Sequence, residues 1–276
     1  IAILILCSIG IIKGQTVSDS LAIMSARWKV ESPQKGIIHK YASIPRLYQG
    51  TQSVSLIEIE PGAGLKVDIA VSDEMKETSR IASEHRGIAA INGSYFDMKR
   101  GNSVCFLKVG NQVVDTTTLS ECKLRVTGAM HVHKGKIKLI PWSRQIEKEY
   151  KGETGIVLAS GPLMLKDGQI CDWNSCGANF IRTKHPRSAV ATTKEGKILL
   201  ITVDGRFPEA EGVNIPELAH LIRILGGEDA LNLDGGGSTT LWLSGASDDG
   251  VVNYPCDNGR FDHAGERKVP NILYIH

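Results

Sequence analysis

The sequence predicts an α+β fold, built mostly from antiparallel sheet with a few packed helices and forming one main domain. Short runs of alternating apolar residues recur along the chain, separated by turn-forming residues. The chain has 29 glycines in 276 residues, and many of them lie between these runs. Only two segments carry clear helical signals. This balance favours hairpins over regularly alternating strand–helix units.

The composition narrows the class of protein. The hydrophobic fraction is 42%, which is ordinary for a globular chain and allows a sizeable core. The formal net charge is only +2, and basic and acidic residues are interspersed. A nucleic-acid partner is therefore not expected.

Residues 1–12 are almost wholly apolar and are followed by Lys13. The run is too short to span a bilayer and is typical of a secretory signal. We expect residues 1–14 to be the remnant of a signal peptide, with a buried N-terminal strand as the alternative. No later segment is long and apolar enough to be a transmembrane segment. The sequence thus predicts an exported protein that is periplasmic, on the cell surface or extracellular.

Disulfide bonds are allowed in an exported protein. Cys105 and Cys122 flank a hairpin-like region and form one candidate pair. Cys171 and Cys176 form a second, which closes a small loop and leaves Cys256 unpaired. The sequence does not fix this connectivity. A zinc site is not expected, because it needs tighter spacing of cysteine and histidine.

The chain after the signal begins with a weakly patterned stretch. Residues 15–50 are interpreted as an N-terminal extension, and the main domain is expected at 51–276. Alternation predicts two strands, at 54–59 and 65–71, with a proline–glycine turn between them.

A helix is expected from Ser72 to about His85, because Ser72 suits the N-cap and acidic residues follow it. A short buried strand at 88–91 comes next. Turn-forming pairs then predict three hairpins, around Gly110-Asn111, Lys134-Gly135 and Asp167-Gly168.

The rest of the chain alternates between strands and irregular segments. Residues 141–153 are charged and poorly patterned, which predicts a surface loop or a short helix. A second helix is expected from Pro216 to Gly226, with one apolar stripe. Further strands are predicted at 156–159, 187–193, 197–203 and 269–275.

One stretch combines strand-like flanks with an unusual polar centre. Apolar residues alternate at 231–233 and again at 241–243. Between them lie Asp234, three consecutive glycines and three hydroxyl residues. Consecutive glycines let a backbone approach a ligand closely, and their N–H groups can form an anion-binding concavity. The alternative is a flexible hairpin with a solvated aspartate.

Several predicted strands end in a polar residue followed by glycine: Asn92-Gly93, Ser160-Gly161, Asp204-Gly205-Arg206 and Asp234-Gly235. Such ends can gather at one rim of a sheet, together with Arg187. The acids would then act in general acid–base or nucleophilic catalysis, and the guanidinium groups would bind phosphate or carboxylate. A set of structural salt bridges is the alternative.

Six motifs recur in a characteristic order: Asn92-Gly93-Ser94-Tyr95-Phe96, Ser160-Gly161-Pro162, Pro186-Arg187-Ser188-Ala189, Val203-Asp204-Gly205-Arg206, Asn232-Leu233-Asp234-Gly235-Gly236-Gly237-Ser238-Thr239 and Gly265-Glu266-Arg267. In these motifs the chain resembles the phosphodiester glycosidases over roughly residues 50–276. Ser94 stands where the family more often has glycine, and Ser188 where it often has threonine. Both departures bear on the identity of the substrate more than on the class of reaction.

The resemblance implies hydrolysis of a sugar-1-phosphodiester at the anomeric carbon, giving a free sugar and a phosphomonoester. It implies Asp234 as the first catalytic carboxylate, which would stabilise the oxocarbenium-like carbon, attack it or activate water, and Glu266 or Asp204 as the second. Arg187 and Arg206, with the N–H groups of the glycine turn, would stabilise the charge on the phosphate. The substrate-binding residues it implies are Asn92, Ser160, His185, Arg187, Arg206, Gly235, Gly236, Gly237, Ser238, Thr239 and Arg267.

The hydroxyls of Ser238 and Thr239 are expected to orient the substrate, and His185 is the one histidine placed to activate a nucleophile. No cofactor is expected, although Asp204, Asp234 and Glu266 leave a divalent cation open. Two other functions therefore compete with the glycosidase. One is a non-catalytic module that binds phosphorylated glycans, and the other is a metal-dependent phosphodiesterase that breaks the P–O bond.

Overall fold

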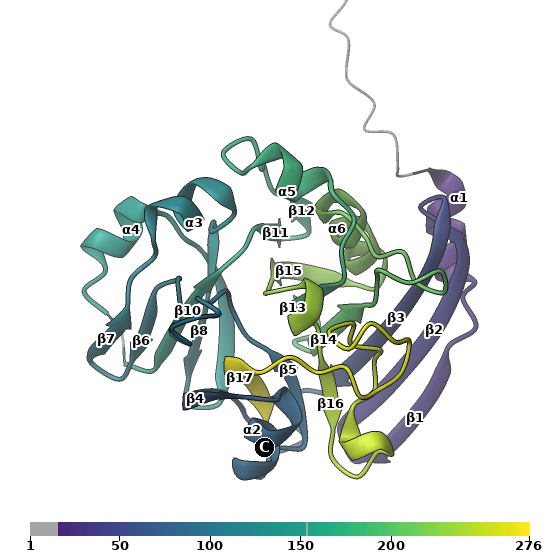
Figure 1. The fold of residues 1–276 in the computed structure, drawn as a ribbon, viewed down its shortest axis with the longest axis horizontal. Coiled ribbons are helices and arrows are strands. Elements are labelled where there is room, and N and C mark those ends of the chain that lie inside the picture. Colours follow the sequence, from purple (N-terminus) through teal and green to yellow (C-terminus); the bar gives the residue numbers. More distant parts are fainter. Residues whose placement is uncertain (1–15, 153) are drawn as a thin grey trace, which may run out of the picture.

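The computed structural model describes residues 16–152 and 154–276. Over these residues all strand pairings are antiparallel, and the strands form three sheets. The expected fold class, mostly antiparallel sheet with a few helices, is confirmed (Figure 1). The largest sheet has the strand order β1 (Lys29–Gln34), β2 (Ile37–Leu47), β3 (Gly50–Ile59), β14 (Ile198–Val203), β13 (Arg187–Thr193), β15 (Gly227–Asn232), β11 (Leu163–Lys166) and β12 (Gln169–Ile170).

The two smaller sheets flank the inner strands of the large one. The second sheet has the order β7 (Gln112–Asp115), β6 (Leu107–Val109), β10 (Ile156–Ser160), β8 (Gly128–His133) and β9 (Lys136–Pro141). The third has the order β16 (Leu241–Leu243), β5 (Ala89–Asn92), β17 (Val269–Ile275) and β4 (Val67–Lys76). The hairpins expected around residues 110, 134 and 167 are confirmed, as β6–β7, β8–β9 and β11–β12.

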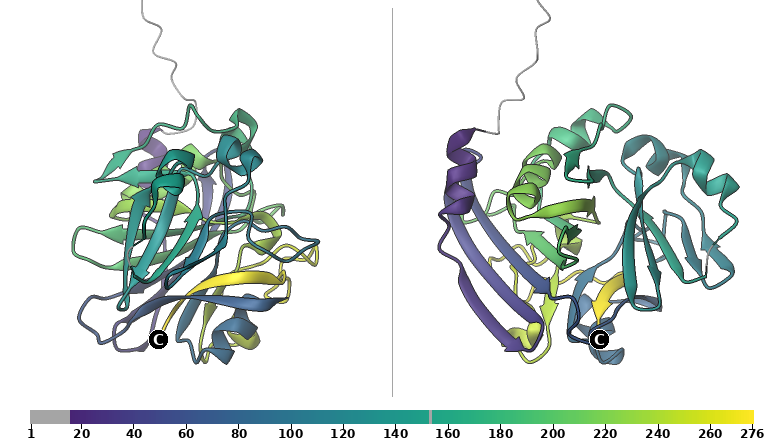
Figure 2. Two further views of the ribbon diagram at one scale, coloured as in Figure 1. Left: turned by 90° about the vertical axis from the view of Figure 1, so that its left-hand side faces the viewer. Right: turned by 180° about the vertical axis from the view of Figure 1, so that it is seen from behind.

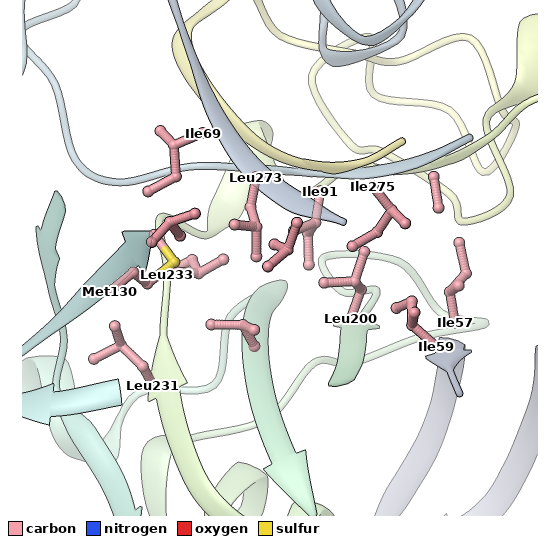
Figure 3. Packing of buried hydrophobic residues seen from close by; sticks show 14 of the residues in the cluster. Ile57, Ile59, Ile69, Ile91, Met130, Leu200, Leu231, Leu233, Leu273 and Ile275 are labelled. Atoms are coloured by element: carbon pink, nitrogen blue, oxygen red, sulfur yellow. The ribbon is translucent and has the colours of Figure 1, made fainter. Parts of the chain in front are cut away.

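All three sheets bury side chains in one shared core. Leu200 and Leu231 come from the large sheet, Met130 from the second, and Ile91 and Leu273 from the third (Figure 3). Each of these five side chains is fully buried. Burying a side chain of this size contributes about 1.5–3 kcal/mol. The shared core therefore fixes the strand ends of the three sheets relative to one another.

The opposite face of the large sheet is covered by α1 (Val17–Met24) and α6 (Ile215–Ile224), which join a second core cluster. With α5 (Ala178–Arg182) they lie together at the top of the right-hand view of Figure 2. The helix expected from Pro216 is confirmed. Its N-cap, Asn214, accepts a hydrogen bond from the Glu217 N–H, and Gly226 follows its C-cap at φ +92°.

The remaining helices are α2 (Thr78–Glu84), α3 (Leu119–Leu124) and α4 (Arg144–Glu149). The helix α4 lies in the charged segment 141–153, where a loop or a short helix was expected. The predicted start of α2 at Ser72 is wrong. Lys76 still pairs with Val269 as part of β4, so the sheet holds this segment extended until the helix begins at Thr78. The predicted end is confirmed, because His85 is the C-cap.

The stretch expected as an N-terminal extension contributes to the large sheet. Within residues 15–50, β2 pairs with β3 along nearly its whole length, and β1 pairs with β2. The sequence of this stretch did not show a clear alternation of apolar and polar residues, because many of its strand positions are exposed. In β1 all six residues are exposed. The expected signal peptide, residues 1–14 with Cys7, lies outside the described residues.

The expected disulfide pairs are not present, because Cys105, Cys122, Cys171, Cys176 and Cys256 are all free. Cys105, two residues before β6, is fully buried, whereas Cys122 lies in α3 and is partly exposed. None of the helices in residues 16–152 and 154–276 is both long and apolar enough to cross a membrane.

Candidate active site

Asp234 directly follows the end of β15 and is fixed through its main chain. Its N–H donates to the carbonyl of Gly93 at 3.0 Å, and its own carbonyl accepts from Asn92 Nδ2 at 2.7 Å. Both partners stand at the end of β5, in another sheet. Two of the strand ends that the sequence predicted to gather at one rim, at Asn92-Gly93 and at Asp234, therefore meet here.

The carboxylate of Asp234 is half-buried and accepts one hydrogen bond, from the Gly235 N–H at 3.0 Å. Burial raises the pKa of Asp234. The hydroxyl of Ser238 and the charges of Arg125 and Arg267 oppose this rise, although the Ser238 hydroxyl is not aligned for a hydrogen bond. Asp234 thus has the setting of a reactive carboxylate: partly desolvated, reachable and surrounded by positive charge.

The glycine turn needs glycine because other groups press against it. A Cβ on Gly235 would lie 2.5 Å from the Pro186 carbonyl oxygen, and one on Gly236 would lie 2.9 Å from Arg206 Nη2. Gly236 also has φ +62°. A Cβ on Gly237 would lie 2.3 Å from Arg267 Nη2. The turn is therefore wrapped by arginine side chains.

The N–H groups of this turn are less available than the sequence implied. Four of them already have acceptors. The Gly235 N–H donates to Asp234 Oδ1, and the other three, those of Gly236, Ser238 and Thr239, donate to the carbonyls of Pro186, Gly235 and Gly236, respectively. The remaining N–H group of this turn, that of Gly237, has no hydrogen-bond acceptor among the described residues. Gly237 is thus the backbone donor that remains for an anion.

Arg206 and Arg267 approach the turn from the loops around it. Arg206 is exposed, and its Nη1 lies 3.7 Å from the sulfur of Cys256. No carboxylate within the described residues forms an ion pair with Arg206. Arg267 instead pairs with Asp257, with nitrogen–oxygen distances of 2.5 and 3.1 Å. Asp257 was not among the predicted site residues.

Arg187 is placed differently from Arg206. It is buried, with Nε donating to the carbonyl of Val213 and Nη2 donating to those of Phe180 and Thr183. Burial lowers the pKa of Arg187 to about 10. Arg187 therefore holds the segment around α5 in place, and its charge also acts on Asp234.

Two of the predicted polar residues form the frame beneath the site. Asn92 is fully buried, and its Oδ1 accepts from the Ser188 hydroxyl at 2.6 Å and the Thr240 N–H at 3.2 Å. Ser160 is also fully buried and donates to the carbonyl of Asn232 at 2.9 Å. These groups join the strand ends to one another.

Asp204 is fully buried and has three donors. The Ser53 hydroxyl donates to it at 2.6 Å, Asn253 Nδ2 at 2.9 Å and the Tyr254 N–H at 3.0 Å. Burial raises the pKa of Asp204 to about 6, against the lowering effect of these hydrogen bonds. The arrangement ties β14 to the loop that follows β16 and leaves the carboxylate without access to solvent.

Glu266 lies at the start of α2. It accepts from the Ser79 N–H at 3.0 Å and from the Ser79 hydroxyl at 2.5 Å. A carboxylate in this position satisfies a free donor of the helix and interacts favourably with its positive end. Burial raises the pKa of Glu266, and the nearby carboxylates of Glu77 and Asp249 add to the rise.

Three further predicted residues lie close to the turn. The hydroxyls of Ser238 and Thr239 are buried and have no hydrogen-bond partner in the described chain. His185 is half-buried, and burial together with the charges of Arg187 and Arg206 lowers its pKa. No hydroxyl group among the described residues hydrogen-bonds to the ring of His185, so no nucleophile is paired with it there.

Sequence reasoning missed Arg125, whose charge also acts on Asp234. Its guanidinium carbon lies 3.5 Å from the ring centroid of Tyr95, and Glu121 holds it by two hydrogen bonds. The i, i+4 spacing of Glu121 and Arg125 was a usable sign of a helical ion pair. Nothing in the sequence placed that pair beside Asp234.

No three histidine, cysteine, aspartate or glutamate side chains gather closely enough to hold a metal ion in the described parts of the chain. Asp204, Asp234 and Glu266 instead occupy three separate environments: a buried hydrogen-bonded site, a half-buried turn and a helix start.

Comparison with known proteins connects this site to a family. A family model described as phosphodiester glycosidase matches residues 85–276. The mouse (Mus musculus) N-acetylglucosamine-1-phosphodiester alpha-N-acetylglucosaminidase is 36% identical over 101 residues, which is 36% of this chain and 18% of that protein. The aligned region is thus less than a fifth of this relative's length.

Solved structures share the fold. The zebrafish N-acetylglucosamine-1-phosphodiester alpha-N-acetylglucosaminidase catalytic domain, described as auto-inhibited by its pro-peptide, matches with a TM-score of 0.64 and 20% identity, covering 91% of this chain and 87% of that one. A putative exported protein from Burkholderia pseudomallei matches with a TM-score of 0.57 and 14% identity, covering 82% of this chain and 74% of that one.

Proposed function

The chain belongs to the phosphodiester glycosidase family, and from this premise we propose that it hydrolyses the C–O bond between a sugar's anomeric carbon and a phosphodiester. The products are a free sugar and a phosphomonoester. One observation carries the proposal: the half-buried carboxylate of Asp234 stands beside a glycine turn, at the centre of a group of arginines.

The phosphate is assigned to the side of the turn where Arg206 lies. Arg206 is exposed and lies against Gly236, and among the described residues it has no carboxylate partner. The N–H of the next glycine, Gly237, has no acceptor in the same residues. Arg267, paired with Asp257, covers the same turn. As the C–O bond breaks, its electron pair moves to the phosphate oxygen, and Arg206 and the Gly237 N–H stabilise the growing negative charge.

Asp234 is assigned the role of general base. A water molecule attacks the anomeric carbon, and the carboxylate takes its proton as the new C–O bond forms. The raised pKa of Asp234 brings this base closer to a neutral working pH, which favours proton transfer. A phosphomonoester leaves readily, so the reaction does not need the strong acid of an ordinary glycosidase.

We expect the reaction to take place outside the cytoplasm, because residues 1–12 have the composition of a secretory signal. The activity for which the mouse relative is named suggests a first probe, N-acetylglucosamine 1-(methyl phosphate).

Hydrolysis of this probe in ¹⁸O-labelled water tests the proposal. We expect the label in the released sugar, because water attacks carbon. Label in methyl phosphate would instead indicate P–O cleavage by a phosphodiesterase. Binding of the probe without turnover would favour a non-catalytic module, and either result would overturn the proposal.

A further inference from the structure

Arg125 is held rigidly at the wall of the site by three contacts. Its guanidinium lies 3.5 Å from the ring centroid of Tyr95 and 5.2 Å from that of Phe180. Glu121 accepts hydrogen bonds from its Nε at 2.6 Å and its Nη2 at 2.9 Å. A guanidinium with its plane and its fork both fixed loses little entropy when it binds a ligand.

The platform beneath Arg125 is connected to the catalytic strand. Tyr95 is buried, and its hydroxyl donates to the Gly161 carbonyl at 2.5 Å and accepts from Asn232 Nδ2 at 2.8 Å. Asn232 is the last residue of β15, two positions before Asp234. The position of Arg125 relative to the reacting carboxylate is therefore set by buried hydrogen bonds.

Arg125 keeps donors for a ligand. Its Nη1 has no hydrogen-bond partner in the described chain, and the side chain is 21% exposed. Glu121 compensates the charge, so the pair as a whole is neutral. Such a pair suits the neutral acceptor oxygens of a sugar, whereas a phosphate is better matched by the uncompensated charge of Arg206.

The segment that precedes Arg125 and the loop that contacts Arg206 lie on different sides of the catalytic strand. In Figure 1, α3 stands to the left of β15, and the yellow loop between β16 and β17 stands to its right. Arg125 directly follows α3, and Cys256 in that loop lies 3.7 Å from Arg206. The bond that breaks joins the sugar to the phosphate and lies at Asp234. The sugar therefore extends to one side of Asp234 and the phosphate to the other.

We propose that Arg125 contacts the sugar half of the substrate, donating from Nη1 to a hydroxyl or amide oxygen of a neutral sugar, and so determines which sugar is accepted. This inference rests on the proposed function. It adds to the same site a residue that recognises the sugar and that directly follows α3.

Product inhibition separates the two halves of the site. With N-acetylglucosamine 1-(methyl phosphate) as substrate, the inhibition constants of free N-acetylglucosamine and of methyl phosphate are measured for the parent protein and Arg125→Met. We expect the constant of the sugar to rise by about tenfold or more, the effect of losing one charge-assisted hydrogen bond. The constant of methyl phosphate should change by less than about twofold.

Two variants serve as controls. Arg80→Met removes an exposed arginine that also forms an i, i+4 ion pair, with Glu84, and should leave both constants unchanged. Arg125→Lys keeps the charge without the fork and should lie between the parent and Arg125→Met. Thermal unfolding of each variant shows whether it is folded.

Equal rises in both constants for Arg125→Met would mean a structural role, and a rise for methyl phosphate alone would place Arg125 at the phosphate. No change in either would mean no contact, and each of these results overturns the inference. A parent protein without turnover on the probe would instead count against the proposed function.

Discussion

The side-chain amide of Asn92 donates a 2.7 Å hydrogen bond to the main-chain carbonyl of Asp234. It joins the end of β5 to the end of β15, and the Asp234 N–H returns a bond to Gly93. The anchoring of Asp234 is thus carried by its backbone. Its carboxylate makes one hydrogen bond, to the next N–H in the chain, and is left available for chemistry.

This division of roles predicts that Asp234→Asn folds normally but is nearly inactive. The main-chain bonds are retained, while the amide cannot take a proton from water. We expect kcat to fall by roughly 10²- to 10⁴-fold, the usual contribution of a general base. Initial rates of sugar release, with thermal unfolding as the control for folding, check this. Turnover near that of the parent would remove Asp234 from the mechanism.

Among the three predicted catalytic carboxylates, only that of Asp234 is accessible and not engaged elsewhere, and this predicts the stereochemistry. Asp204 is buried and Glu266 is engaged at α2, so neither stands ready as a partner acid. Direct attack by water, with Asp234 as base, inverts the anomeric centre. Proton NMR during the first minutes of hydrolysis should show the anomer opposite to that of the substrate. Initial formation of the same anomer would mean that Asp234, or another group, forms a covalent intermediate.

Arg206 should matter for the phosphate half of the substrate. Its guanidinium lies against Gly236 and has no carboxylate partner in the described residues. We expect Arg206→Met to raise the inhibition constant of methyl phosphate by about tenfold, since hydrogen bonds to charged groups contribute roughly 1.5–3 kcal/mol. Arg86→Met is a matched control, because Arg86 is also exposed and has a positive φ of 53°. An equal effect of both substitutions would contradict the assignment.

The sequence predicted local features better than long-range ones. The turn at Asp234 and the helix that begins near Pro216 and ends before Gly226 are encoded by neighbouring residues, and both are found in place. The start of α2 was predicted too early, because the pairing of Lys76 with Val269, far along the chain, overrides the local helix signal.

The same distinction explains the site. Strand ends with a polar residue and glycine predicted that Asn92 and Asp234 meet, since the pattern marks both ends. Asp204 and Glu266 accept hydrogen bonds from residues in segments that are distant in sequence, and no sequence motif specifies such bonds. Arg125 was missed for this reason also: its i, i+4 pair is local, but its stacking on Tyr95 is not.

The burial of Asp204 predicts a pH-dependent cost to stability. Burial raises its pKa from 3.8 to about 6, so between these values the native state holds a proton that the unfolded chain has released. This contribution to stability is complete below about pH 4 and is lost as the pH rises through about 6. At neutral pH the loss is up to roughly 3 kcal/mol, because one pKa unit is worth about 1.4 kcal/mol.

Asp204→Asn removes this cost, since the amide oxygen can accept from Asn253 and Tyr254 while the NH₂ group donates to Ser53. We expect it to be at least as stable as the parent at neutral pH and to flatten the pH dependence, as measured by urea unfolding at about pH 4 and about pH 7.5. Hydrolysis should stay within about threefold. A folded variant as inactive as Asp234→Asn would restore Asp204 to the catalytic group.

Glu266 should act on stability and leave the chemistry intact. It accepts two hydrogen bonds from Ser79 in the first turn of α2, and loss of such a cap costs about 1 kcal/mol. We expect Glu266→Ala to lower the free energy of unfolding by about this amount, with Glu266→Gln intermediate because its amide oxygen still accepts the N–H. For both variants kcat should remain within about twofold. If Glu266→Gln instead lost activity at unchanged stability, Glu266 would be the second catalytic carboxylate, and the single-carboxylate mechanism would fail with it.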